Sequence, residues 1–115
     1  MSRFKTMLRG RSKPGVMNKT EAVYEGLLRI RQIEGAVLWY AYEAITFKLA
    51  KDTRYTPDFV VMLQDGSFEC HEVKGFWRDD AKVKIKVAAA MFPIKFIAVK
   101  ALPKKAGGGW EIEEF

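Results

Sequence analysis

Apolar residues recur three and four positions apart between residues 18 and 33, and this spacing predicts an amphipathic helix. Asn18 or Thr20 can cap its first turn, because their side chains accept hydrogen bonds from free backbone N–H groups. Glu21 follows Asn18 by three positions, which is the spacing of a capping box. Gly35 is a suitable residue to end this helix.

Beyond Gly35 the pattern changes to short runs of β-branched and aromatic residues, which favour strands. We expect strands at 43–48, 55–63 and 67–74. Asp65-Gly66 separates the last two, and this dipeptide is typical of a tight turn between antiparallel strands.

The C-terminal part of the chain predicts a further helix and further strands. A helix is expected over 79–92, and Pro93 ends it. The apolar run at 94–99 fits a buried strand, and the alternation of apolar and acidic residues at 110–115 fits a last edge strand. A strand, a helix and a strand in succession favour a crossover between parallel strands. The predicted fold class is therefore α/β (α+β): an α-β-β-β-α-β core in which helices flank a mixed central sheet.

Basic residues are unevenly distributed along the chain, which has a net charge of +6. Residues 1–19 hold six basic side chains and no acidic one, whereas the other residues hold 14 of each sign. We predict a flexible basic arm at 1–17, followed by a single domain at 18–115. Such an arm can neutralise DNA phosphates and release counterions, and the alternative is a solvated tail. The six candidate DNA-binding residues are Arg3, Lys5, Arg9, Arg11, Lys13 and Lys19.

The composition excludes several classes of protein. No apolar run reaches the roughly 20 residues needed to span a bilayer, and no apolar signal core follows the basic N-terminus. Cys70 is the sole cysteine, so an internal disulfide is excluded, and with His71 as the sole histidine a zinc finger is excluded too. We expect an intracellular, cytoplasmic protein with no membrane partner.

Two carboxylates and a lysine meet at one end of the predicted hairpin. Glu72 and Lys74 are two positions apart on a strand and therefore point to the same face. Asp58 lies on the partner strand, seven residues before Asp65, while Glu72 lies six residues after Gly66. Antiparallel pairing therefore brings Asp58 close to Glu72.

Like charges this close are most simply compensated by a hard divalent cation. We therefore predict a Mg²⁺ site formed by Asp58, Glu72 and the main-chain carbonyl of Val73, in which Mn²⁺ can substitute. The metal would act as a Lewis acid and acidify a bound water, while Lys74 would stabilise developing charge or position that water. This chemistry suits hydrolysis of a phosphodiester. The alternative is a surface salt bridge on a hairpin.

Pro57-Asp58, followed after thirteen residues by Glu72-Val73-Lys74, resembles the signature of the PD-(D/E)xK nuclease superfamily. The predicted order of elements is also similar to the core of that superfamily, and the resemblance covers residues 18–99. It implies a restriction-endonuclease-like fold and metal-dependent cleavage of DNA. It further implies that Asp58 and Glu72 are metal ligands and that Lys74 is the catalytic lysine.

The resemblance extends to residues on the two helices. Asn18-Lys19-Thr20-Glu21 resembles the segment with a helical acid in phage endonuclease I-type and Holliday-junction-resolving members, which implies a catalytic role for Glu21. Two alternatives remain: Glu25 is the helical acid, or Glu21 is only a capping-box residue. In similar nucleases a polar residue of the second helix faces the site. Lys84 or Lys86 is thus expected to touch a DNA phosphate, with a solvated helix face as the alternative.

The leading functional hypothesis is a phage-like, structure-selective endonuclease that acts on branched or double-stranded DNA, such as a Holliday junction resolvase. A domain of this size has one active centre, and resolving a junction needs two symmetric cuts, so we expect a homodimer. Apolar surface near Trp39 and Tyr40, or the C-terminal edge, would form the dimer interface. One alternative is a repair or nicking nuclease of the same superfamily. Another is a non-catalytic DNA-binding or assembly subunit whose carboxylates form ion pairs.

Overall fold

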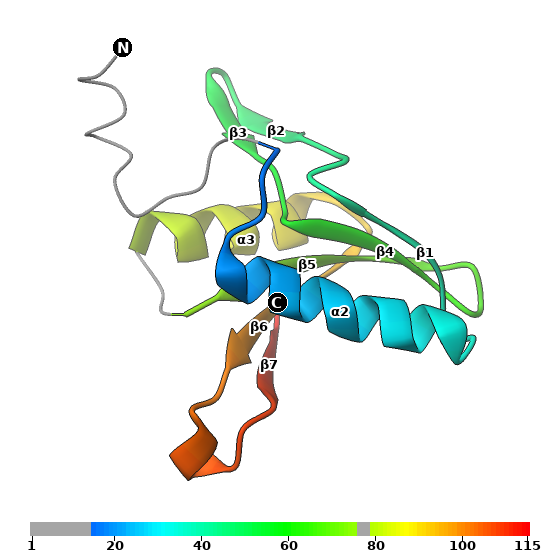
Figure 1. The fold of residues 1–115 in the computed structure, drawn as a ribbon. Coiled ribbons are helices and arrows are strands. Elements are labelled where there is room, and N and C mark those ends of the chain that lie inside the picture. Colours follow the sequence, from blue (N-terminus) through cyan, green and yellow to red (C-terminus); the bar gives the residue numbers. More distant parts are fainter. Residues whose placement is uncertain (1–14, 76–78) are drawn as a thin grey trace.

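A computed structural model describes residues 15–75 and 79–115 of the chain (Figure 1). The helices in this part are α2 (Lys19–Ile33) and α3 (Asp79–Met91), with a short 3-10 turn η1 (Lys104–Ala106). The strands are β1 (Val37–Tyr42), β2 (Phe47–Ala50), β3 (Thr53–Tyr55), β4 (Phe59–Leu63), β5 (Phe68–Lys74), β6 (Lys95–Ala101) and β7 (Trp110–Glu114).

Five of these strands form one mixed sheet in the spatial order β1-β4-β5-β6-β7. β5 and β6 are parallel and are joined through α3, whereas all other neighbours in the sheet are antiparallel. β2 and β3 form a separate antiparallel hairpin. The described part is therefore an α+β protein with two helices, a mixed five-stranded sheet and a hairpin.

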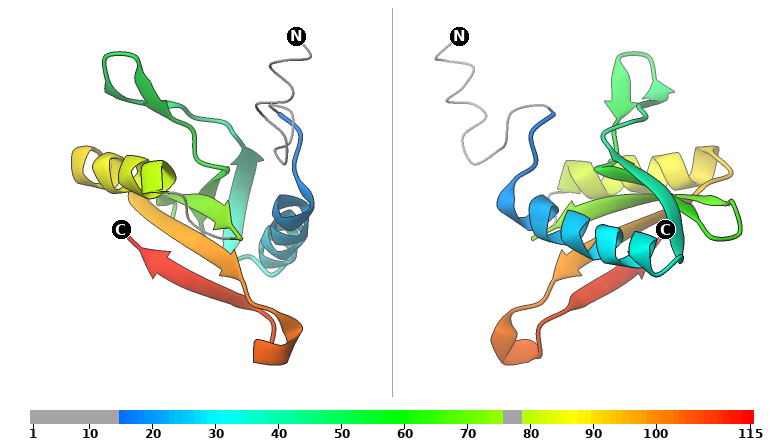
Figure 2. Two further views of the ribbon diagram at one scale, coloured as in Figure 1. Left: turned by 90° about the vertical axis from the view of Figure 1, so that its left-hand side faces the viewer. Right: turned by 45° about the vertical axis from the view of Figure 1, so that its right-hand side comes forward.

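The two helices lie on opposite faces of the sheet (Figure 2). Alternate residues of β5 point to the two faces, so that Val73 faces α2 and Cys70 faces α3. The buried cluster on the α2 side contains Tyr24, Leu28, Val37, Phe59, Val61, Val73, Ile97 and Val99. The cluster on the α3 side contains Phe47, Tyr55, Val60, Cys70, Ile85, Ala88 and Phe96. Neither α2 nor α3 is long and apolar enough to cross a membrane.

Most of the predicted elements are confirmed. Asn18 caps α2 and forms a capping box with Glu21. The Asp65-Gly66 turn joins the antiparallel strands β4 and β5. The second helix and both C-terminal strands also lie where the sequence predicts them, at α3, β6 and β7.

Two of the predicted strands were wrong, and β1 (Val37–Tyr42) was not predicted. The strand expected at 43–48 begins only at Phe47, as β2, because Glu43 has a φ of 50°, a left-handed conformation that interrupts extended backbone. The strand expected at 55–63 is divided into β3 and β4, since Pro57 has no N–H to continue a ladder. Between these two interruptions, the chain forms the β2–β3 hairpin, which in the sequence separates the paired strands β1 and β4 of the main sheet.

The first described residues contact the domain, although residues up to 17 were expected to belong to a loose arm. Gly15 N–H donates to Glu43 Oε1 at 2.9 Å, and Met17 packs against the cluster on the α2 side. Residues 1–14 lie outside the described part of the chain.

Candidate active site

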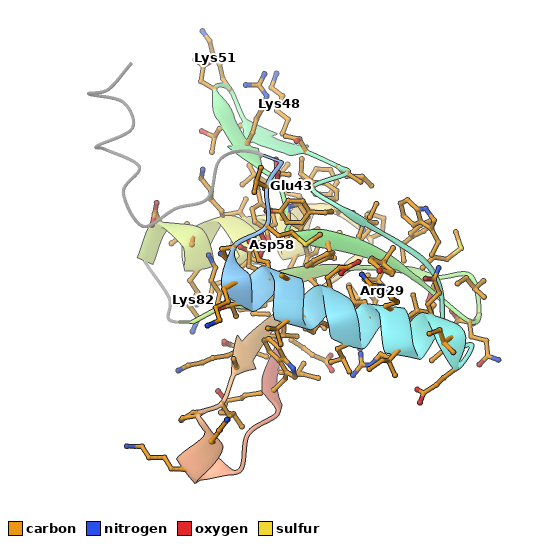
Figure 3. The ribbon with its side chains drawn as sticks, in the orientation of Figure 1. Arg29, Glu43, Lys48, Lys51, Asp58 and Lys82 are labelled. Carbon is orange, nitrogen blue, oxygen red and sulfur yellow. The ribbon has the colours of Figure 1, made fainter. Side chains whose placement is uncertain are left out.

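The predicted catalytic residues gather at one end of the sheet, where the start of β4 lies beside the ends of β1 and β5. This follows from topology, because β4 runs antiparallel to both neighbours. Asp58 and Glu43 lie at this end of the sheet, beside the first turn of α2 (Figure 3). The β2–β3 hairpin, which carries Lys48 and Lys51, lies next to them. Residues far apart in the sequence are thus brought to one place.

Asp58 immediately precedes β4, and its Oδ2 accepts a hydrogen bond from Val73 N–H at 2.8 Å. Phe59 pairs with His71, so one further step in the same register brings Asp58 opposite Glu72. The hairpin therefore brings these two carboxylates together, as the sequence predicts. Burial raises the pKa of the Asp58 carboxyl well above its usual range, and the charge of Glu72 raises it further.

Glu72 lies near the end of β5 and is buried to the same extent as Asp58, each being 8% exposed. The Tyr55 hydroxyl donates a 2.6 Å hydrogen bond to Glu72 Oε1, while Lys74 Nζ lies 3.2 Å from Glu72 Oε2. Burial and the charge of Glu72 raise the pKa of the Tyr55 phenol, which therefore stays protonated and remains a donor. Glu72 is thus held by a neutral donor on one oxygen and by an ammonium group on the other.

Glu21 is the third buried acidic residue at this end of the sheet, with 7% of its surface exposed. Its Oε1 accepts hydrogen bonds from Asn18 N–H at 2.9 Å and from the Tyr42 hydroxyl at 2.9 Å. Contact with Glu21 also contributes to the raised pKa of Asp58. Glu21 is therefore a capping-box residue and, at the same time, a neighbour of Asp58.

Glu25, the alternative helical acid, has different partners. Its carboxylate pairs with Arg29 at 2.7 Å and accepts a hydrogen bond from the Tyr40 hydroxyl at 2.6 Å. Hydrogen bonding from Tyr40 lowers the pKa of Glu25. Of the two acids on α2, the structure brings Glu21 to Asp58 and engages Glu25 elsewhere.

The carbonyl of Val73 lies at the same end of the sheet. In an extended strand the N–H and C=O of one residue point the same way, so this carbonyl points towards β4, as the N–H does. The β4–β5 register, continued by two residues, brings Pro57 opposite Val73. Because proline has no N–H, position 57 cannot donate a ladder hydrogen bond to the Val73 carbonyl. The Pro57-Asp58 pair thus supplies no ladder hydrogen bond to this main-chain oxygen.

This donor set fits a hard divalent cation. Asp58, Glu72 and the Val73 carbonyl offer only oxygen ligands, and a bound cation would offset the burial and the Glu72 charge that raise the pKa of Asp58. Among residues 15–75 and 79–115, no three Asp, Glu, His or Cys side chains form a ready-made metal cage. Mg²⁺ usually binds one or two carboxylates and keeps several waters, whereas Zn²⁺ is usually held by Cys and His side chains. A set of two carboxylates therefore fits Mg²⁺ better than Zn²⁺.

The predicted DNA-binding lysines are placed differently from one another. Lys19 is exposed at the first residue of α2, two positions from Glu21. Lys86 lines a shallow apolar hollow with Phe115, whose N–H bonds to the carbonyl of Phe96 at the end of β6 remote from Asp58. Lys84 is about 200° away from Lys86 around α3, on the opposite flank. Arg3, Lys5, Arg9, Arg11 and Lys13 lie outside the described residues.

His71 is a structural residue, as its position on the strand predicts. It is buried, its Nδ1 forms a 2.7 Å hydrogen bond with the Tyr24 hydroxyl, and its Nε2 lies 2.9 Å from Glu69. These contacts are on the α2 side of the sheet, whereas Glu72 points to the other side. His71 is therefore not positioned as a general base for this site.

No protein-family model matches the chain, and no curated protein or solved structure matches it either. Its function is therefore inferred from the chemistry of the site.

Sequence reasoning missed two site residues, Tyr42 and Tyr55. Tyr42 lies in a segment for which no strand was predicted, and Tyr55 was predicted only as the start of a strand. Their partners are 21 and 17 residues away in the sequence, and no local pattern signals contacts of that range. The two phenols hold Glu21 and Glu72 and so define the shape of the site.

Proposed function

We propose that this chain is a Mg²⁺-dependent endodeoxyribonuclease of the PD-(D/E)xK type. The observation that carries the proposal is that Asp58, Glu72 and Lys74 lie together at one end of the paired strands β4 and β5. All three come from the hairpin that bears the Pro-Asp and Glu-x-Lys sequences. A surface ion pair would need only Glu72 and Lys74, and it would not account for a second buried carboxylate opposite them.

The order of the elements supports a restriction-endonuclease-like core. Without the β2–β3 hairpin, the first six elements follow the order α2-β1-β4-β5-α3-β6, which is the α-β-β-β-α-β arrangement of that core. On this interpretation the β2–β3 hairpin and β7 are additions to the core.

Asp58, Glu72 and the Val73 carbonyl would hold the metal, which when bound supplies a Lewis acid and a more acidic water. The Tyr55 hydroxyl fixes the orientation of Glu72. Lys74 can donate to a phosphate oxygen where negative charge develops, because its Nζ lies beside the carboxylate of Glu72, a proposed metal ligand. Glu21 keeps a third acidic group against Asp58. Mn²⁺ is expected to substitute for Mg²⁺.

We further propose that the substrate is branched DNA, as for a Holliday junction resolvase, and that the protein acts as a homodimer. One active centre per chain and two symmetric cuts per junction require two chains. Exposed apolar side chains at the end of the sheet remote from Asp58 suit self-association. These are Leu38, Trp39 and Phe68, the last two of which are in ring contact at 6.4 Å.

A second candidate function is a non-catalytic DNA-binding subunit. The observation that favours it is the ion pair between Glu72 and Lys74, because a lysine engaged in this way is less available to a phosphate. In that case Asp58 would be a buried carboxyl with no metal to bind.

The test is cleavage of a synthetic four-way DNA junction and a matched linear duplex, each with and without Mg²⁺. Asp58→Asn is the inactive control. The proposal expects paired, symmetric nicks in the junction only, lost without metal and in the variant. Equal cutting of both substrates would retain the nuclease and favour a repair or nicking enzyme. Binding without cutting of either substrate would overturn the catalytic proposal in favour of the DNA-binding subunit.

A further inference from the structure

The β2–β3 hairpin presents a basic outer face close to the candidate site. Lys48 and Arg54 are register partners, so their side chains lie on the same face of the hairpin, and both are exposed. Lys51 is exposed in the turn, and Figure 3 shows Lys51 at the tip of the hairpin and Lys48 projecting from β2. The hairpin thus carries three basic side chains that point away from the body of the domain.

These charges are not compensated within the described part of the chain. None of the ion pairs found there involves Lys48, Lys51 or Arg54. Asp52 is the one acidic residue between positions 47 and 55, so three basic residues and one acid leave a local charge of +2. Like charges directly opposite each other on a hairpin are destabilising, so this arrangement opposes folding of the hairpin unless an anionic partner is present.

The inner face of the hairpin is firmly held. The Phe47 ring lies 4.8 Å from that of Phe92 and 5.3 Å from that of Phe96. Tyr55 is buried in the same cluster, and its hydroxyl donates to Glu72. The base of the hairpin is therefore part of the candidate site, while its tip extends away from it.

We propose that the β2–β3 hairpin is a clamp for the DNA backbone, in which Lys48, Lys51 and Arg54 bind phosphates on one side of the bond that is cut, up to about four nucleotides from it. This inference rests on the proposed nuclease function. Lys51 is four residues from Tyr55, which corresponds to about 13 Å of strand at 3.3 Å per residue. In the proposed clamp the hairpin lies along the DNA axis, where the rise is 3.4 Å per nucleotide of one strand, so the tip contacts phosphates about four nucleotides from the cut.

The salt dependence of DNA binding tests the clamp without requiring cleavage. Binding to the four-way junction and to the linear duplex is measured between 50 and 200 mM salt with Ca²⁺ in place of Mg²⁺. Each lost phosphate contact lowers the slope of log K against log salt by about 0.9. We expect a decrease of about 1.8 for the Lys48→Gln/Arg54→Gln variant, and about 2.7 when Lys51→Gln is added.

The matched control is Arg29→Gln/Arg31→Gln, which removes two basic charges from the C-terminal half of α2. Figure 3 shows Arg29 on this helix, away from the hairpin. This control is expected to keep the wild-type slope. The hairpin variants should unfold at the wild-type temperature or slightly above it, because they remove a repulsion. An unchanged slope in the hairpin variants, an equal loss in the control, or absence of DNA binding by the wild-type chain would each overturn the clamp.

A tethered cleavage reagent tests where the tip lies on the DNA. Burial raises the pKa of the Cys70 thiol to about 12, so Lys51→Cys provides the one readily modified thiol among the described residues. Iron–EDTA attached there, in an Asp58→Asn background, should cut within about four nucleotides of the bond that the wild-type chain cuts. Cuts more than a helical turn away would overturn the assignment. The nuclease proposal fails separately, by an absence of Mg²⁺-dependent cutting in the wild-type chain.

Discussion

At the scale of single residues, three buried carboxylates face few positive charges. The hydrogen bond from Val73 N–H lowers the pKa of Asp58, but burial and the charge of Glu72 outweigh it and raise that pKa. A carboxyl whose pKa is raised on folding keeps its proton where the unfolded chain has lost it. The free energy of unfolding therefore falls as the pH rises above about 4, the ordinary carboxyl pKa, towards the folded-state pKa.

Asp58→Asn should consequently stabilise the metal-free protein at pH 8, while abolishing cleavage. The amide is neutral at every pH and can still accept the hydrogen bond from Val73 N–H. Each unit by which folding raises the pKa corresponds to about 1.4 kcal/mol. Urea denaturation at pH 4.5 and pH 8 in EDTA measures the effect, with the exposed turn residue Asp65→Asn as control. If wild type and Asp58→Asn lost the same free energy of unfolding between pH 4.5 and pH 8, folding would not raise the pKa of Asp58, and the prediction would be wrong.

Tyr55→Phe tests the part played by the phenol that holds Glu72. Groups that orient metal ligands typically change metal affinity or activity 10- to 100-fold, so we expect the Mg²⁺ concentration for half-maximal cleavage to rise by about that factor. Tyr40→Phe is the matched control, because it removes a hydroxyl from Glu25 instead. A uniform loss of cleavage with no change in the Mg²⁺ requirement would assign Tyr55 a purely structural role.

At the scale of elements, the sequence predicts what depends on neighbouring residues. The Asn18–Glu21 capping box and the Asp65-Gly66 turn are local signals, and both elements formed as expected. The pairing of Asp58 with Glu72 followed from the length of that hairpin. By contrast, the φ of Glu43 has no sequence signature, so β1 was not predicted and the β2–β3 hairpin was not recognised. The tyrosine partners of the site were missed for the same reason, since they reach it through tertiary contacts.

Asn18→Ala tests whether the helix cap also positions the site. Loss of an N-cap side chain costs about 1 kcal/mol of stability, and here it also removes the hydrogen bond from Glu21 N–H to Asn18 Oδ1. We expect a lower urea midpoint together with reduced cleavage. Asn18→Ser should restore both, because serine caps a helix about equally well. Full activity in a destabilised Asn18→Ala variant would separate the cap from the function of Glu21.

At the scale of the whole molecule, the two ends of the sheet differ. The end with Asp58 carries the buried acids and the basic hairpin, whereas the other end exposes Leu38, Trp39 and Phe68. Exposed apolar groups of this kind suit an interface between copies of a chain. The arrangement would leave the candidate active sites of a dimer open to DNA.

Sedimentation of the purified protein should therefore give a species of twice the 13.2 kDa chain mass. Trp39→Asp places a charge within the apolar surface and is expected to shift the equilibrium to the monomer. Lys104→Asp, in the exposed η1 turn, changes charge without touching that surface and should leave the dimer intact. A monomeric wild-type chain would remove the basis for two symmetric cuts by one particle.

The most direct test of the central claim is the nicking of a supercoiled plasmid over time by wild type, Glu72→Gln and Glu25→Gln. The account predicts nicking by wild type only with Mg²⁺ or Mn²⁺, a loss of at least about a thousandfold in Glu72→Gln, and an unchanged rate in Glu25→Gln. Nicking that survives in Glu72→Gln or proceeds in EDTA would contradict a metal-dependent nuclease site at Asp58, Glu72 and Lys74.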